Sequence, residues 1–202
     1  SAGTPCILGP KTFQPVAAQM PGFSYSWNFG AGASIPTATT YGPHTIEYFT
    51  SGTKTVQLIV FSNAAGASCG DTSTVSFNVV NCPGSIVGKV RKTDGMPISG
   101  VNLRLYADMN LDGIQDTTIA IRSVFSSTIG EYSMASIIPG YYVIVQVQPA
   151  GYISVSDQDT SNDNDSIPNT NMNDNIIPVT VEPSESDADN VFVETPTPGT
   201  IT

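Results

Sequence analysis

The feature that most constrains this chain is a short apolar–polar alternation that recurs along its whole length. Successive side chains of a β-strand face opposite sides of a sheet, so alternation rich in β-branched and aromatic residues is typical of strands. Turn sequences such as "MPG", "TSG", "TDG" and "IPG" separate the runs, and no stretch keeps a helical period over about twelve residues. Many short strands at this spacing predict an all-β chain made of β-sandwiches. The predicted strands are "FSYSWNF" (23–29), "KTVQLIVF" (54–61), "STVSFNVV" (73–80), "SIVGKV" (85–90), "VNLRLY" (101–106), "YYVIVQVQ" (141–148) and "NVFVE" (190–194).

The chain is long enough for two domains, since 202 residues allow about 100 residues for each. The segment "NCPG" at 81–84 follows one predicted strand and precedes the next, so the boundary is expected there. The predicted domains are residues 1–82 and 83–195, and the Thr/Pro-rich residues 196–202 are expected to be a linker or a C-terminal arm. The opening "SAGTPC" is interpreted as a mature or excised N-terminus.

The net negative charge is confined to the second half of the chain, residues 83–202. Residues 1–82 carry Lys11 and Lys54 against Glu47 and Asp71, so the net charge of −10 belongs entirely to residues 83–202. Nucleic acid is therefore not expected as a partner, because a phosphate backbone needs a basic surface. An excess of carboxylates favours divalent cations instead. No apolar run approaches the roughly 18 residues of a membrane span.

The first domain resembles the polycystic-kidney-disease (PKD) type of immunoglobulin-like domain. The motifs that carry the resemblance are "WNFGAG", "HTIEY" and "GTKTVQLIV", within about residues 12–80. Asn28 and Ala31 replace the acidic residues that are usual in the family's turn, which puts any polar or cation-binding role of that turn in doubt. Trp27 and Phe29 are expected in the core, and His44, the only histidine, is expected to be structural.

The second domain resembles the B-type repeats of serine-aspartate-repeat adhesins and their collagen-adhesin relatives. The resemblance covers about residues 84–195 and rests on Gly100–Tyr106, Gly130–Tyr132, Pro139–Tyr142 and Pro149–Tyr152. Together the two resemblances imply two tandem immunoglobulin-like β-sandwich domains.

The segment "YADMNLDGIQD" at 106–116 matches three quarters of an EF-hand-type calcium loop. Gly113 stands at the position that needs glycine, but Ile119 replaces the bidentate glutamate at the twelfth position. The loop is therefore one ligand short. The predicted calcium ligands of this loop are Asp108, Asn110, Asp112, Ile114 through its carbonyl oxygen, and Asp116.

A second acidic segment, "SDQDTSNDNDS" at 156–166, can complete the set, because in the resembled family such a loop completes the calcium sites. Oxygen-only ligands select calcium over zinc or copper, and magnesium gives up its water less readily. Calcium is therefore the predicted cofactor. The ligands expected from this segment are Asp157, Asp159, Asp163 and Asp165.

The three cysteines, Cys6, Cys69 and Cys82, favour a disulfide over a zinc site. In a sandwich of the resembled type, the first strand starts at the end where the loop between the last two strands lies. That topology implies a bridge between Cys6 and Cys69, with Cys82 free or paired with another molecule.

Catalysis is not expected, because one histidine cannot build a triad and the sequence has no nucleophile-elbow or phosphate-loop motif. Some domains of the resembled collagen-adhesin B type form a Lys–Asn isopeptide bond with help from a buried acid. Lys89 or Lys92 and Asn190 are the residues that could react here. The strand that should supply the acid has Gln146 and Gln148 instead, which argues against the bond.

Three functional interpretations remain open, all of them extracellular or at the cell surface. The chain is a calcium-stiffened structural or adhesive piece of a bacterial surface protein or fibre, an accessory glycan- or matrix-binding module of a secreted enzyme, or a subunit that polymerises head to tail. In the last case an extended terminal arm would add a strand to the neighbouring copy. The alternative is that both ends are linkers in a longer tandem array, in which case the partners are neighbouring domains of that array.

Overall fold

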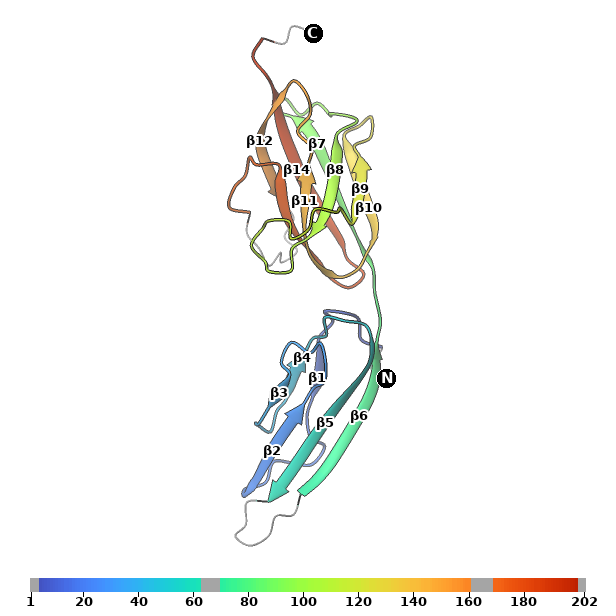
Figure 1. The fold of residues 1–202 in the computed structure, drawn as a ribbon, viewed down its shortest axis with the longest axis vertical. Helices are drawn as coiled ribbons and strands as arrows, with labels where there is room; N and C mark the ends of the chain where they lie inside the picture. Colours follow the sequence, from blue (N-terminus) through green and yellow to red (C-terminus); the bar gives the residue numbers. More distant parts are fainter. Residues whose placement is uncertain (1–3, 63–69, 161–168, 200–202) are drawn as a thin grey trace. The chain divides into compact units, whose positions relative to one another are not determined.

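The structure is a computed structural model that describes residues 4–62, 70–160 and 169–199. Every regular element in these ranges is a strand, so the all-β prediction is confirmed (Figure 1). Each of the seven alternating runs coincides with a strand. The contacts within the chain divide it into two compact units, Ser1–Cys82 and Pro83–Thr202.

The first unit is a small sandwich of two sheets, one with strand order β3-β2-β5-β6 and one formed by β1 and β4. Between the two sheets lies a core rich in aromatic side chains, including Phe13, Trp27, Phe29 and Tyr48. The Trp27 and Phe29 rings stack with centroids 5.6 Å apart, as expected for core residues. The strands are β1 (Lys11–Phe13), β2 (Phe23–Asn28), β3 (Thr37–Ala38), β4 (His44–Ile46), β5 (Gly52–Ser62) and β6 (Gly70–Val79).

The disulfide joins Cys6 to Cys82, so the predicted bridge between Cys6 and Cys69 is wrong. Cys6 pairs in parallel with Val80, directly after the C-terminal end of β6. The loop that carries Cys69 precedes the other end of β6, which is about 30 Å away for a strand of this length. Cys82, in contrast, leaves β6 beside Cys6, with a Cα–Cα distance of 5.6 Å. Cys69 itself lies outside the described residues.

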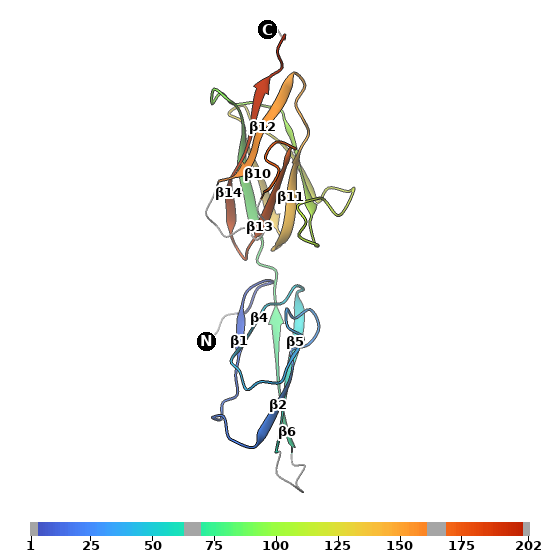
Figure 2. The same cartoon turned by 90° about the vertical axis from the view of Figure 1, so that its left-hand side faces the viewer.

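The second unit is a sandwich of two four-stranded sheets, with strand orders β10-β7-β14-β12 and β13-β11-β8-β9 (Figures 1 and 2). Buried side chains from both sheets form one apolar core, in which Ile86, Leu105, Ile144 and Phe192 are fully buried. The strands are β7 (Gly84–Lys92), β8 (Asn102–Ala107), β9 (Arg122–Phe125), β10 (Glu131–Ile137), β11 (Gly140–Gln146), β12 (Tyr152–Asp159), β13 (Ile176–Val181) and β14 (Ser186–Pro196).

The first and last strands of the second unit, β7 and β14, are neighbours and run parallel, with pairs from Ser186↔Ser85 to Glu194↔Lys92. Strand β14 therefore lies inside its sheet, between β7 and β12. It continues to Pro196, and the amide of Thr197 still donates a hydrogen bond to the carbonyl of Gly151. The segment that follows the folded unit thus begins later than the sequence suggested.

Candidate calcium-binding loops

The first candidate loop leaves the end of β8 and curls around the carboxylate of Asp108, which is fully buried. This carboxylate accepts hydrogen bonds from the amides of Asp112 (3.2 Å) and Gly113 (2.9 Å). Gly113 has a φ of 76°, a left-handed conformation that favours glycine. The glycine in the motif is therefore explained by the backbone turn that brings the loop back onto Asp108.

Other predicted ligands of this loop lie around the same turn. The amide of Asp112 is within hydrogen-bond distance of both Asp108 Oδ1 and Asn110 Oδ1, at 3.2 and 3.3 Å. These two oxygens therefore converge on one point. The carboxylate of Asp116 accepts a hydrogen bond from the amide of Met109. The amide of Asp116 donates a hydrogen bond to the carbonyl of Ala107 at 3.0 Å, which closes the loop.

The second candidate segment begins at the end of β12, where Asp157 is fully buried and Asp159 is partly buried. The Asp157 carboxylate accepts hydrogen bonds from the Ser154 hydroxyl (3.1 Å) and the Asn175 amide (2.5 Å). Burial raises the pKa of Asp157 from its usual 3.8 to about 6, and the nearby carboxylates of Glu194 and Asp174 add to the rise. A nearby cation would offset the free-energy cost of burying the negatively charged Asp157 carboxylate. Asp163 and Asp165 lie outside the described residues.

Among the residues that the structure describes, the two segments do not bring three acidic, histidine or cysteine side chains together as a metal site. Asp108 is held by its own loop, whereas Asp157 is held by Ser154 and Asn175. The first loop also approaches β13. A methyl group added to Gly113 would lie 3.6 Å from Cγ of Pro178, and Pro178 follows Asp174 by four residues.

The chemistry of the donors fits calcium, because all side-chain donors are carboxylate or amide oxygens and Ile114 can add its carbonyl oxygen. In the first loop, Asp108, Asn110 and Asp112 would hold the ion, and an oxygen from the 156–166 segment would have to complete the set. An ion bound there would neutralise carboxylates that otherwise repel one another. The calcium site remains a prediction.

A buried polar network escaped the sequence analysis. Glu194 is fully buried, and its carboxylate accepts hydrogen bonds from the side-chain amides of Gln146 (2.5 Å) and Gln148 (2.6 Å). Alternation along β14 contained the signal, because Glu194 falls on the same face as the core residue Phe192. The two glutamines thus provide donors for a buried carboxylate, an arrangement that single-strand patterns do not reveal.

Strand orientation prevents Lys89 from reaching Asn190. Lys89 lies on the solvent face of β7, where its ammonium pairs with Glu131 at 3.3 Å. The residue that opposes Asn190 across the strands is Gly88. The buried Asn190 amide donates to the carboxylate of Asp187 at 2.6 Å.

In the first unit, the turn of the "WNFGAG" segment lies against the ammonium group of a buried lysine. The Lys54 ammonium donates to the carbonyl of Ala31 (3.3 Å) and to the Thr50 hydroxyl (2.7 Å). His44 packs edge-on against Trp27, with ring centroids 5.4 Å apart, and its Nε2 lies 3.1 Å from the carbonyl of Thr40. These contacts give His44 a structural position.

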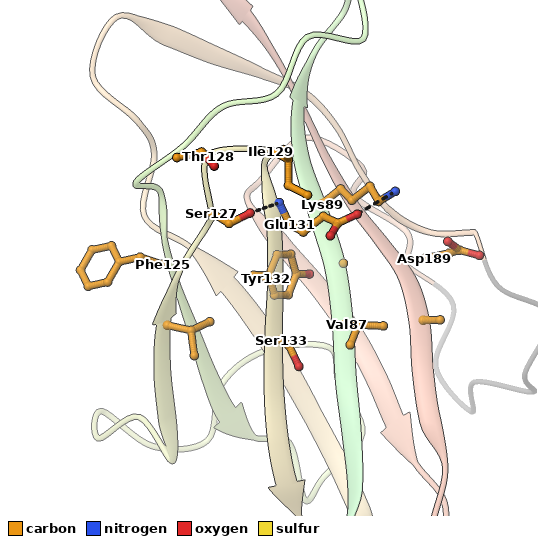
Figure 3. Close-up of a pocket in the computed structure, with 13 residues that line it drawn as sticks. Val87, Lys89, Phe125, Ser127, Thr128, Ile129, Glu131, Tyr132, Ser133 and Asp189 are labelled. Atoms are coloured by element: carbon orange, nitrogen blue, oxygen red, sulfur yellow. Dashed lines mark hydrogen bonds and ion pairs between the residues drawn. The ribbon is translucent and has the colours of Figure 1, made fainter.

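An open groove of about 680 Å³ lies on the second unit, between the β9–β10 connection and the solvent face of β7 (Figure 3). Phe125, at one side, exposes 67% of its surface, while Tyr132 is buried beneath the groove. The ion pair of Lys89 and Glu131 crosses the groove, so its two charges compensate each other. This surface combines the exposed Phe125 ring with that ion pair and with the exposed carboxylate of Asp189.

Comparison with known proteins finds no matching family model and no matching curated protein. Solved structures match this chain at low similarity. GBS52, the minor pilin of Streptococcus agalactiae, has 14% identity and a TM-score of 0.39 over 90% of this chain and 85% of that one. The Bacillus anthracis TIE protein has 12% identity and a TM-score of 0.44 over 87% and 34%. BcpA, the major pilin subunit of Bacillus cereus, has 11% identity and a TM-score of 0.39 over 87% and 57%.

These similarities are too weak to carry an argument about family or function. The candidate functions therefore depend on the residues and contacts described above. No helix in residues 4–62, 70–160 and 169–199 is long and apolar enough to cross a membrane.

Proposed function

We propose that this chain is a non-catalytic structural module of an extracellular or cell-surface protein or fibre, and that calcium stiffens its second unit. The observation that carries the proposal is the loop around Asp108. A fully buried carboxylate, a convergent amide oxygen from Asn110 and a left-handed glycine together form a turn suited to a hard cation.

The disulfide supports the extracellular part of the proposal. Cys6 and Cys82 are bonded, and disulfides persist in oxidising compartments such as the cell exterior, whereas the cytosol keeps thiols reduced. The confinement of the net negative charge to residues 83–202 supports a role for calcium in that unit alone.

Calorimetry with calcium and with a chelator tests the proposal. An ion at about 100 times its Kd stabilises the folded state by about 2.7 kcal/mol, which raises the Tm of a unit this size by about 8–16 °C. We expect this shift in the second unit only. Asp112→Ala should remove most of it, because Asp112 belongs to the predicted ligand set and its carboxylate also accepts the amide of Ile114.

Asp94→Ala is the matched control, since it removes one carboxylate from an exposed turn of the same unit, outside both acidic segments. It should leave the calcium shift intact. Equal shifts in both units, or equal losses in Asp94→Ala and Asp112→Ala, would indicate general charge screening instead of a site.

A second candidate function is an accessory glycan- or matrix-binding module, which the exposed Phe125 beside the groove favours. Aromatic side chains offer a large contact area at such surfaces. Binding of soluble polysaccharides and of collagen can be measured for the intact chain and for Phe125→Ala. Phe49→Ala, a change at another exposed phenylalanine, serves as the control. Unchanged binding in Phe125→Ala would exclude this surface.

A further part of the proposal is that the chain assembles with copies of itself, through the segment after Thr197. Electron microscopy of native material, followed by deletion of residues 198–202, tests this idea. The deletion leaves β14 and the hydrogen bond between Thr197 and Gly151 in place. Fibres that form normally after the deletion would show that this segment is a linker and not a donated strand.

A further inference from the structure

The disulfide encloses the whole described fold of the first unit. Cys6 precedes β1, Cys82 follows β6, and the two cysteines are 76 positions apart in the sequence. The core cluster runs from Ile7 to Val79, so every core residue lies between the two bonded cysteines. The chain thus enters and leaves this unit at two points whose Cα atoms are 5.6 Å apart.

This connection determines where tension travels. A force applied to the chain before Cys6 and after Cys82 passes through the S–S bond, because the bond is the shorter covalent path. The polypeptide between the two cysteines then carries no load. Strands β1 to β6 lie outside the path along which the force is transmitted, so the hydrogen bonds between them bear no tension.

The described part of the second unit has no such bridge, and tension must pass through its strands. Force enters at Gly84, the start of β7, and leaves at Pro196, the end of β14. These two strands are parallel neighbours, so opposite pulls slide one along the other. The ladder from Ser186↔Ser85 to Glu194↔Lys92 then resists in shear, with its hydrogen bonds loaded together.

We propose that the Cys6–Cys82 disulfide transmits tension past the folded strands of the first unit and so makes that unit inextensible. The second unit is then the part that yields and lengthens when the chain is pulled. This mechanical role goes beyond the function proposed above and depends neither on calcium nor on the identity of any partner.

Single-molecule force spectroscopy on the full chain, pulled from its two termini, tests the proposal. The second unit spans about 113 residues from Gly84 to Pro196, so its rupture should release about 350 Å of chain. The oxidised protein should show this one release. Opening of the first unit would add about 250 Å, from the 76 positions between its cysteines.

The added release should appear only when the disulfide is open. Dithiothreitol, which becomes oxidised as it converts Cys6 and Cys82 to thiols, should produce it in protein that folded with the bond intact. Cys6→Ser should show it without reductant, and Cys69→Ser should behave as the unaltered chain. If Cys6→Ser does not fold, reduction of the unaltered protein under load still tests the proposal. A release of about 250 Å in the oxidised protein, or none after reduction, overturns the proposal.

Discussion

Replacement of Gly88 by alanine should destabilise the second unit strongly. Gly88 is buried in β7, between Tyr132 of β10 and Asn190 of β14. An added methyl carbon would lie 2.1 Å from the carbonyl oxygen of Asn190 and 2.5 Å from the hydroxyl of Tyr132. The missing side chain is what allows Tyr132 to cross β7 and donate its hydrogen bond to Asn190, at 3.2 Å.

The expected cost has two contributions. Forcing a methyl group into a filled site costs about 1–3 kcal/mol, and the lost buried hydrogen bond costs about 1 kcal/mol more. The sum of about 2–4 kcal/mol corresponds to a Tm decrease of about 6–24 °C in the second unit. Calorimetry measures both units, and fluorescence of Trp27, the only tryptophan, reports on the first unit alone.

Gly70→Ala is the control for this experiment. Gly70 also lies in a strand, but an added methyl group would meet only ordinary contacts at 3.5 and 3.6 Å. We expect the free energy of unfolding of that variant to change by no more than about 0.5 kcal/mol. Alanine loses less conformational freedom in a strand than glycine does, so the substitution is not expected to be costly. The packing argument would be refuted if the Tm of the second unit were unchanged in Gly88→Ala. It would also be refuted if the unfolding transition of the first unit, followed by Trp27 fluorescence, shifted.

Two further predictions concern pH and redox state. Because the pKa of Asp157 is raised to about 6 in the folded protein, its protonation stabilises the fold at low pH, and this stability is lost as pH rises through 6. In chelator, the second unit should be about 1 kcal/mol more stable at pH 5 than at pH 7.5, and Asp157→Asn should abolish the difference in urea unfolding. Reduction of Cys6–Cys82, which closes a loop of 76 positions, should cost the first unit about 4 kcal/mol. Urea unfolding followed by Trp27 fluorescence should show the loss, while an equal shift of the second calorimetric transition would contradict it.

Much of the fold could be predicted because alternation records which face of a strand is buried. Along β5, Lys54, Val56 and Leu58 are buried and Thr55 is exposed, as the sequence indicates. Strand β13 carries no such pattern, since almost all of its residues are buried. It also contains Pro178, which argues against an interior strand and agrees with the position of β13 at a sheet edge.

The errors and omissions have a different origin, because they depend on which segments meet in space. The pairing of Cys6 was wrong because it required knowing at which end of β6 the N-terminal segment lies. The burial of Glu194 with Gln146 and Gln148 requires two sheets to face each other. The acidic loop at Asp108 was visible as a motif because the hydrogen bonds that close it are local, between residues at most nine positions apart.

The position of β14 has a consequence for how the second unit can be made. This strand comes last in the chain, yet it lies between β7 and β12. A ribosome or an export channel delivers β7 about 100 residues earlier than the strand that completes its sheet. Until residue 196 emerges, one edge of β7 stays unpaired and open to association with other chains. The unit therefore cannot fold gradually as it emerges. It must close late, in a single slow step that joins the two ends of the domain.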